Sequence, residues 1–163
     1  MEPKRIAVGS DEKTHLTDFV VANLQERGRI LQLFGSLVGD NDEWAEVSFK
    51  LAEAVAGEQC DEGILFCWTG TGSSIAANKV PGARAALCYD AETARGARKW
   101  NHANVLVMSL RLTSTPQAKE ILDAWFSTPF GEEAFDVRNV ERVNDIEAKY
   151  SRDDSKGTPD DPA

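Results

Sequence analysis

Short apolar runs typical of buried β-strands alternate along this chain with segments whose apolar residues recur at helical spacing. The predicted strands cover residues 5–9, 29–34, 63–67, 84–88 and 104–108. The predicted helices between and after them cover residues 15–27, 44–56, 73–79, 91–101 and 116–126. Each helix of such an alternation crosses over the sheet and buries its apolar face there, so consecutive strands run parallel. The sequence therefore predicts a three-layer α/β/α sandwich around a five-stranded, Rossmann-like parallel sheet.

The length of 163 residues fits a single domain, which we place at residues 1–150. Apolar residues recur at helical spacing from Glu132 to Lys149 and predict a C-terminal helix that packs across the domain or onto a partner subunit. Residues 151–163 are acidic, contain proline and glycine, and lack the apolar side chains that drive ordering. We therefore expect a disordered acidic tail after the domain.

Charge and cysteine content narrow the range of partners. The formal net charge of −9 predicts no nucleic-acid partner, because the field of the protein would repel a phosphate backbone. The three cysteines lack the spacing of a zinc site or a disulfide framework, which indicates no metal and a reducing compartment. No signal peptide is visible, and no segment approaches the roughly 20 apolar residues of a membrane span. We expect a cytoplasmic protein that contacts no membrane.

The segment from Gly63 to Lys79, GILFCWTGTGSSIAANK, carries the strongest functional signal. A predicted strand ends there at Cys67, and a loop of small residues leads into the next helix. Ligands of parallel sheets bind beyond the carboxyl ends of the strands, and Gly70 and Gly72 allow a ligand to approach the backbone. Glycine-rich turns also occur without any function, and the segment lacks the full dinucleotide-binding fingerprint. The residues alone mark a candidate site and leave its ligand open.

The longer stretch ILFCWTGTGSSIAANKVPGARAALC closely resembles the active-site segment of type B ribose-5-phosphate isomerases and the related galactose-6-phosphate isomerases. The resemblance extends to IAVGSD near the N-terminus, AEAVA at residues 52–56, NHANVL at residues 101–106 and STPF at residues 127–130. It covers nearly the whole chain except the tail. It implies an aldose–ketose isomerase without metal or cofactor, which moves a proton between C1 and C2 of a sugar or sugar phosphate through a cis-enediolate.

The resemblance also implies roles for single residues of the loop. Cys67 corresponds to the general base, and Thr69 to the hydroxyl that helps to move the proton between O1 and O2. A free thiol has a pKa near ~8.5, but a helix N-terminus can lower such a value. Backbone amides of the loop would face the negative oxygen of the transition state, where one fixed donor contributes roughly 3–4 kcal/mol. These amides belong to Gly70, Thr71, Gly72, Ser73 and Ser74.

Substrate contacts are implied elsewhere in the chain. Asn101 corresponds to an asparagine that contacts sugar oxygens, and Arg111 and Arg138 correspond to retained arginines. Asp11 corresponds to the aspartate of the family's Ser-Asp-His loop, and it can also be interpreted as a helix cap. In the family a second subunit completes the site, so the resemblance implies a homodimer, alone or as half of a dimer of dimers.

The chain departs from the family pattern at its sugar-binding positions. The Asp-His pair of the family reads Asp11-Glu12, so an acid replaces a histidine that helps to hold the substrate phosphate. The histidine that assists ring opening corresponds to Trp100, and the tyrosine that lines the sugar site corresponds to Trp44. Ala134 corresponds to one of the two phosphate-binding arginines of the family. Compared with the family, the predicted pocket therefore has fewer cationic and more aromatic side chains.

These changes leave the substrate open. Phosphate recognition depends on charge-assisted contacts, so phosphate is held differently, through Arg111 and Arg138, or the substrate is unphosphorylated or otherwise modified. His102 can replace the ring-opening acid only after rearrangement of its loop, and the simpler expectation is a solvent-facing histidine. Trp68, which replaces a loop glycine, is expected to face the sugar rather than the core.

Two hypotheses from different classes remain. The first is the isomerase, whose substrate would be an open-chain sugar such as a tetrose derivative if no ring-opening acid is present. The alternative is a non-catalytic sugar- or nucleotide-binding module that keeps the fold. Exchange of the proton at C2 separates the two, because a protein that only binds the sugar cannot exchange it.

Overall fold

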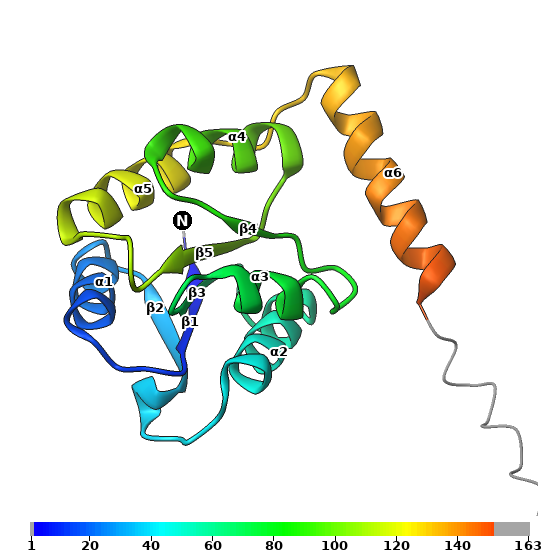
Figure 1. Ribbon diagram of the computed structural model, residues 1–163. Helices are drawn as coiled ribbons and strands as arrows, with labels where there is room; N and C mark the ends of the chain where they lie inside the picture. Colours follow the sequence, from blue (N-terminus) through cyan, green and yellow to red (C-terminus); the bar gives the residue numbers. More distant parts are fainter. Residues whose placement is uncertain (1, 152–163) are drawn as a thin grey trace, which may run out of the picture.

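The computed structural model describes residues 2–151. Its central sheet has five strands in the order β2-β1-β3-β5-β4, and every pairing is parallel (Figure 1). The strands are β1 (Arg5–Ser10), β2 (Ile30–Gly35), β3 (Glu62–Cys67), β4 (Ala85–Leu87) and β5 (Val105–Ser109). The predicted five-stranded parallel sheet is therefore confirmed.

Helices cover both faces of this sheet and connect its strands (Figure 1). They are α1 (His15–Glu26), the short 3-10 helix η1 (Ser36–Val38), α2 (Trp44–Ala56), α3 (Thr71–Ala77), α4 (Ala91–Asn101), α5 (Thr115–Ser127) and α6 (Ala134–Tyr150). None of the helices in the described part of the chain combines the length and apolarity that a membrane span requires.

Alternate residues of the central strands enter two separate cores, one on each face of the sheet. Ile64 and Phe66 of β3 pack with α1, α4 and α5, whereas Leu65 packs with α2 and α3. This alternation follows from the strand period of two, which sends successive side chains to opposite faces. The apolar runs of the sequence have no polar face because both faces of the sheet are covered. The three-layer architecture is thereby confirmed.

The helix after β3 begins earlier than the sequence predicts. α3 starts at Thr71 instead of residue 73, and the residue before it, Gly70, has φ +83. A side chain at Gly70 would place its Cβ 2.5 Å from Leu87 Cδ1, so this position requires glycine for both its backbone and its surroundings. The tight turn brings the backbone from the end of β3 into the helix within three residues.

The C-terminal helix α6 extends away from the rest of the molecule (Figure 1). It has no buried residue, and Phe135 and Tyr150 are 69% and 71% exposed. Helix α4 is its main neighbour within the chain, and Glu147 accepts a hydrogen bond of 2.9 Å from the backbone N–H of Gly82. The expected tail begins directly after this helix, and residues 152–163 lie outside the described part of the chain.

Candidate active site

The carboxyl ends of β1, β3 and β5 meet at one edge of the sheet. Cys67 and Ser109 are register partners, and Ser10 pairs with the residue before Cys67. Asp11 follows Ser10 directly, so the structure brings Asp11 and Cys67 to the same edge. The Cys67 thiol is free, and the residue is 8% exposed. This edge is the place where ligands of open parallel sheets bind.

Hydrogen bonds from the segment after β5 fix the loop that follows Cys67. The N–H of Leu110 donates to the Cys67 carbonyl at 2.9 Å, and the N–H of Arg111 donates to the Trp68 carbonyl at 3.0 Å. The Ser109 hydroxyl also donates to the Trp68 carbonyl, at 2.9 Å. The exposed residue Arg111 therefore lies beside the loop that follows Cys67, in the segment that fixes this loop.

Small hydroxyl residues follow in the loop and in the first turn of α3. The hydroxyls of Thr69 and Thr71 lie 2.7 Å apart, and both residues are exposed. Ser73 is buried as a whole, so neither its hydroxyl nor its backbone is exposed to a ligand in this structure. Ser74 donates its N–H to the Gly70 carbonyl at 3.1 Å. The N–H groups before it are those that the first turn of a helix leaves without helical acceptors.

Trp44, at the first position of α2, packs against the start of α3. A Cβ added at Gly72 would lie 3.0 Å from Cε3 of the Trp44 ring. The glycine therefore permits close contact between the indole ring and the loop. Trp44 remains 44% exposed and also lines the neighbouring pocket, whereas Trp68 is exposed above the loop. Both tryptophans thus lie at the edge of the sheet that carries Cys67.

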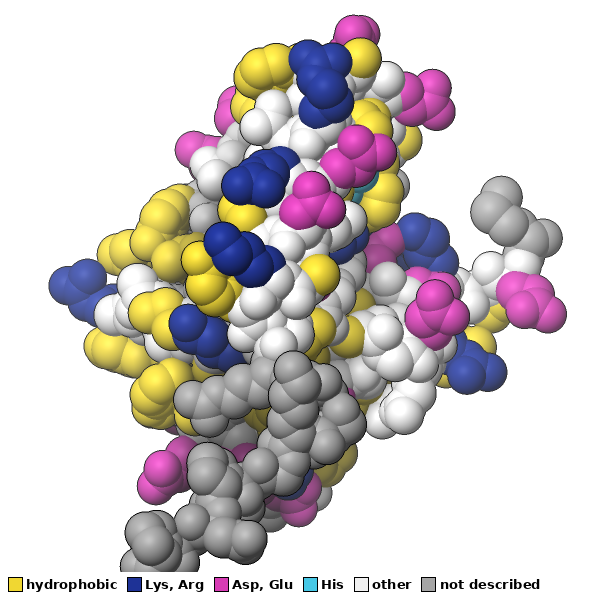
Figure 2. Space-filling view, turned by 90° about the vertical axis from the view of Figure 1, so that its right-hand side faces the viewer, with side chains coloured by type: hydrophobic (Ala, Val, Ile, Leu, Met, Phe, Trp, Pro, Cys, Tyr) yellow, Lys and Arg dark blue, Asp and Glu magenta, His cyan; other side chains and the backbone are white. Residues whose placement is uncertain are grey.

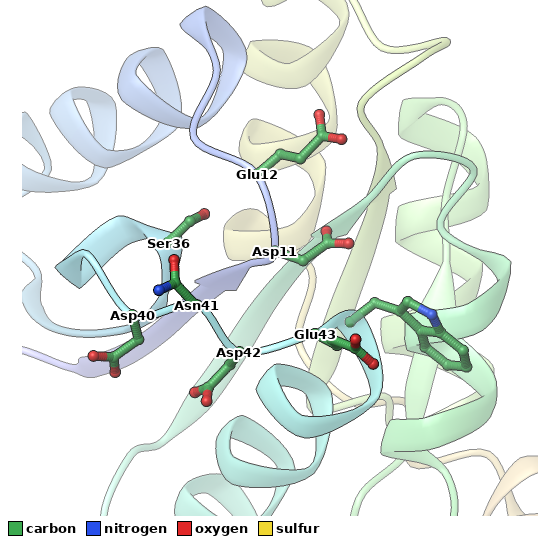
Figure 3. Close-up of a pocket in the computed structure, with 8 residues that line it drawn as sticks. Asp11, Glu12, Ser36, Asp40, Asn41, Asp42 and Glu43 are labelled. Atoms are coloured by element: carbon green, nitrogen blue, oxygen red, sulfur yellow. The ribbon is translucent and has the colours of Figure 1, made fainter.

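A pocket of about 550 Å³ opens beside Trp44 at this edge (Figure 3). It is lined by Asp11, Glu12, Ser36, Asp40, Asn41, Asp42, Glu43 and Trp44. Five of these eight residues are acidic, and none is a lysine or arginine. Asp42 forms an ion pair of 2.8 Å with Lys50, whose pKa is raised mainly by this hydrogen bond. A phosphate group in this pocket would find no cation among the lining residues.

Asp11 does not cap a helix, so the interpretation of this residue as a cap is wrong. Thr14 caps α1 instead, through a reciprocal capping box with Thr17. The Oδ1 atom of Asp11 is buried and has no hydrogen-bond partner among the described residues. An unsatisfied buried carboxylate oxygen costs free energy unless a ligand or water completes it. This oxygen therefore lacks a hydrogen-bond donor within residues 2–151, and a ligand or water that reaches it would supply one.

Trp100 and Asn101 lie at the opposite edge of the sheet. They end α4, and the chain then enters β5 at its amino end, where the Asn104 carbonyl accepts a hydrogen bond from the N–H of Gly63. The four residue steps of β3 from Gly63 to Cys67 span roughly 13 Å at ~3.3 Å per residue. One chain therefore does not bring Trp100 or Asn101 to Cys67.

Arg138 is also remote from Cys67 within one chain. It lies in the second turn of α6. The segment before α6 is attached at Lys99 through Gly131, α6 itself is attached at Gly82, and both attachments are at the amino edge of the sheet. Arg142 follows one helical turn later on the same side of the helix. Both arginines are exposed, and neither has an ion pair within residues 2–151 (Figure 2 shows one face of the molecule, with its charged side chains).

Several residues of the acidic pocket did not emerge from the sequence. The pocket residues come from the run GDNDEW at residues 39–44, whose density of acidic side chains before a helix was the available signal. Among the described residues, no three His, Cys, Asp or Glu side chains are grouped in a way that could hold a metal ion.

Comparison with known proteins identifies the family of this chain. The family model described as Ribose/Galactose Isomerase matches residues 6–146. A D-erythrulose-4-phosphate isomerase of Pectobacterium atrosepticum is 37% identical over 131 residues, which cover 77% of this chain and 84% of the relative. Ribose-5-phosphate isomerase B of Escherichia coli is 36% identical over 147 residues, which cover 90% of this chain and 98% of the relative.

Solved structures share the fold at similar identity. A Clostridium thermocellum ribose-5-phosphate isomerase B superposes with a TM-score of 0.84 at 37% identity, covering 90% of this chain and 99% of that one. A Mycoplasma genitalium ribose-5-phosphate isomerase B with bound ribulose-5-phosphate has a TM-score of 0.82 at 30% identity, covering 89% and 97%. The prediction of an isomerase of this kind is thereby confirmed. The chain belongs to the ribose/galactose isomerase family.

Proposed function

We propose that this aldose–ketose isomerase acts on a sugar or sugar phosphate by proton transfer through a cis-enediolate, with Cys67 as the base. The observation that carries the proposal is the position of Cys67, whose free thiol ends β3 beside the glycine-containing turn. The thiolate removes the proton from C2 of the aldose, and the electron pair left on C2 forms the enediolate. The same thiol then returns the proton to C1 of the ketose.

The remaining proton moves between the two oxygens of the enediolate. Thr69 is exposed directly after the Cys67–Trp68 pair, and its hydroxyl is part of a short hydrogen-bonded pair with Thr71. Such a pair can donate to one oxygen while it accepts from the other. The N–H groups of Thr71 and Gly72 in the first turn of α3 would stabilise the negative oxygen. Asp11 would accept a hydrogen bond from a substrate hydroxyl through its unpartnered Oδ1.

A second copy of the chain completes this site in our proposal. Asn101 and Arg138, which the family resemblance assigns to the substrate, lie at the amino edge and cannot serve the Cys67 of their own chain. Helix α6 also presents an exposed apolar stripe, and spacing places its members on one side of the helix: Phe135, Val143, Ile146 and Tyr150. An apolar stripe of this kind favours burial against a partner, which supports a homodimer.

Cations for a phosphate group would come from outside the acidic pocket. Arg111 lies beside the loop on the same chain, and Arg138 would be contributed by the partner copy. Guanidinium groups suit this role because they donate two parallel hydrogen bonds to phosphate. The relatives named for ribose-5-phosphate and erythrulose-4-phosphate isomerisation favour a phosphorylated substrate. The five acidic side chains of the pocket instead favour a substrate whose end in this pocket carries no charged group.

Deuterium exchange tests both the chemistry and the substrate class. The protein is incubated in D2O with four- to six-carbon aldoses and ketoses, phosphorylated and free, and incorporation at C1 and C2 is followed by NMR. Cys67→Ala should abolish incorporation. Cys88→Ala is the matched control, because burial raises the pKa of Cys88 to about 12 although this residue also follows a strand at the carboxyl edge. Tight binding of a sugar without exchange in the folded wild-type protein would show a binding module instead.

A further inference from the structure

The segment between α5 and α6, residues 128–133, is held firmly against the end of α4. The ring of Phe130 stacks on the His102 ring with centroids 4.7 Å apart and planes inclined by 7°. His102 Nε2 lies 2.9 Å from the Gly131 carbonyl oxygen, and the Gly131 N–H donates to the Lys99 carbonyl at 2.9 Å. A Cβ at Gly131 would overlap that carbonyl oxygen, so only glycine allows this approach.

A buried arginine, Arg98, packs against the same segment. Arg98 is 7% exposed, and its guanidinium lies 4.3 Å from the Phe130 ring centroid and 4.9 Å from that of Trp125. It donates to the Ala103 carbonyl at 2.7 Å and pairs with the buried carboxylate of Glu62 at 3.4 Å. Glu62 also accepts from the Trp125 indole at 2.6 Å. This arrangement leaves the Arg98 guanidinium little conformational freedom, so the Phe130 ring that packs on it is also held in a fixed position.

We call Arg98, His102, Phe130 and Gly131 the linker clamp. Its importance follows from how little else holds α6, since that helix has no buried residue and has one further side-chain tie to the body, from Glu147 to Gly82, within the described chain. The other side of the clamp is the last turn of α4, which carries Asn101. The linker clamp therefore fixes two separate elements, the end of α4 and the start of α6, relative to each other.

We infer that the linker clamp is a positioning device, which presents Asn101 and Arg138 together to the active site of a second copy of the chain. The inference rests on the proposed function, because it requires the site to be shared between two copies. Arg98, His102 and Phe130 touch no substrate and act through the two residues that they position. His102 is thus not the solvent-facing residue expected from the sequence, and its ring nitrogen is engaged away from any sugar.

Substitution of the clamp should lower catalysis more than it lowers stability. Phe130→Ala should reduce kcat/KM at least tenfold, while Phe130→Tyr, which keeps the stacked ring, should retain most of it. Phe126→Ala is the matched control, because Phe126 ends α5 under the guanidiniums of Arg27 and Arg29 and is not part of the clamp. If Phe126→Ala lowers kcat/KM as much as Phe130→Ala at equal loss of thermal stability, the positioning role is refuted.

Mixing of variants shows which site the clamp serves. His102→Gln keeps a donor toward Gly131 and should keep the fold and the dimer, with reduced activity. Mixed in equal amounts with inactive Cys67→Ala chains, it should give dimers of which about half are mixed, each with one intact site. The activity should therefore exceed the sum of the separate variants and approach about a quarter of wild type if His102→Gln itself is nearly inactive.

A reference mixture separates the two proposals. An equal mixture of Arg138→Ala chains and Cys67→Ala chains should recover activity through the same shared site. Recovery there without recovery for His102→Gln means that the clamp acts on its own chain, which overturns the inference and leaves the proposed function intact. Failure of the reference mixture, with dimer exchange shown by sedimentation, means that the site is not shared, which refutes the second-copy part of the proposed function and the inference with it, whereas the Cys67 chemistry is tested separately by deuterium exchange.

Discussion

Gly70→Ala should destabilise the turn into α3, and Gly28→Ala is the control that separates the cost of the backbone conformation from the cost of the steric clash. Both glycines have positive φ, +83 and +71, so alanine meets a similar backbone cost of about 1–2 kcal/mol at each position. A Cβ added at Gly28 would meet only open space, whereas at Gly70 the new Cβ would lie 2.5 Å from Leu87 Cδ1. Overpacking of this kind adds about 1–3 kcal/mol.

The expected loss in free energy of unfolding is therefore about 1–2 kcal/mol for Gly28→Ala and about 2–5 kcal/mol for Gly70→Ala. Urea titration measures both losses, provided that the m-values of the variants equal that of wild type. The value of kcat/KM should fall only for Gly70→Ala, because this turn carries the proposed anion-binding amides. The double variant Gly70→Ala with Leu87→Ala should be less destabilised than the two single effects predict, since the clash is removed. Equal losses for Gly28→Ala and Gly70→Ala, or strict additivity with Leu87→Ala, would show that the contact with Leu87 carries no energy.

Three further predictions concern substrate, assembly and pH. Glu12→His should raise the ratio of kcat/KM for phosphorylated over free sugars by about tenfold, because it removes an acid from the pocket and adds a cationic donor; an unchanged ratio would place the phosphate elsewhere. Phe135→Glu should convert the dimer to a monomer in sedimentation and abolish exchange, since a charge would enter the apolar stripe; an active dimer would contradict this role. The hydrogen bond from Lys119 holds the pKa of Asp123 below its ordinary value, so wild type should be more stable than Asp123→Asn at neutral pH. That difference should shrink as the pH falls through the lowered pKa of Asp123, and thermal melts that show a constant gap would rule out the linkage.

The architecture was readable from the sequence because both faces of the sheet are covered. Runs such as Ile64 to Phe66 have no polar face, and the helices between them have one apolar side, so the alternation of elements left few possible folds. The end of β3 at Cys67 was also predicted. The start of α3 was placed too late because the turn depends on the positive φ of Gly70, which is a three-dimensional requirement.

The candidate site was less accessible because it combines residues that depend on packing. The interpretation of Asp11 as a helix cap was reasonable from its type, but Thr14 and Thr17 satisfy the start of α1 and leave Asp11 free. The position of Asn101 at the amino edge follows from the direction of α4, and the predicted order of a helix at residues 91–101 before a parallel strand at residues 104–108 already implied it. His102 received its stacked position from Phe130, a contact between residues far apart in the sequence that no local pattern encodes.

The exposed stripe of α6 has a consequence for the behaviour of the protein in solution. In the proposed dimer, a dissociated chain keeps Cys67 and its loop but lacks the residues that a second α4 and α6 bring. Mass action then makes the number of complete sites fall faster than the protein concentration on dilution. The specific activity therefore reports the fraction of chains that are dimeric. Substrate that binds across two copies would stabilise the dimer and so protect the activity against dilution.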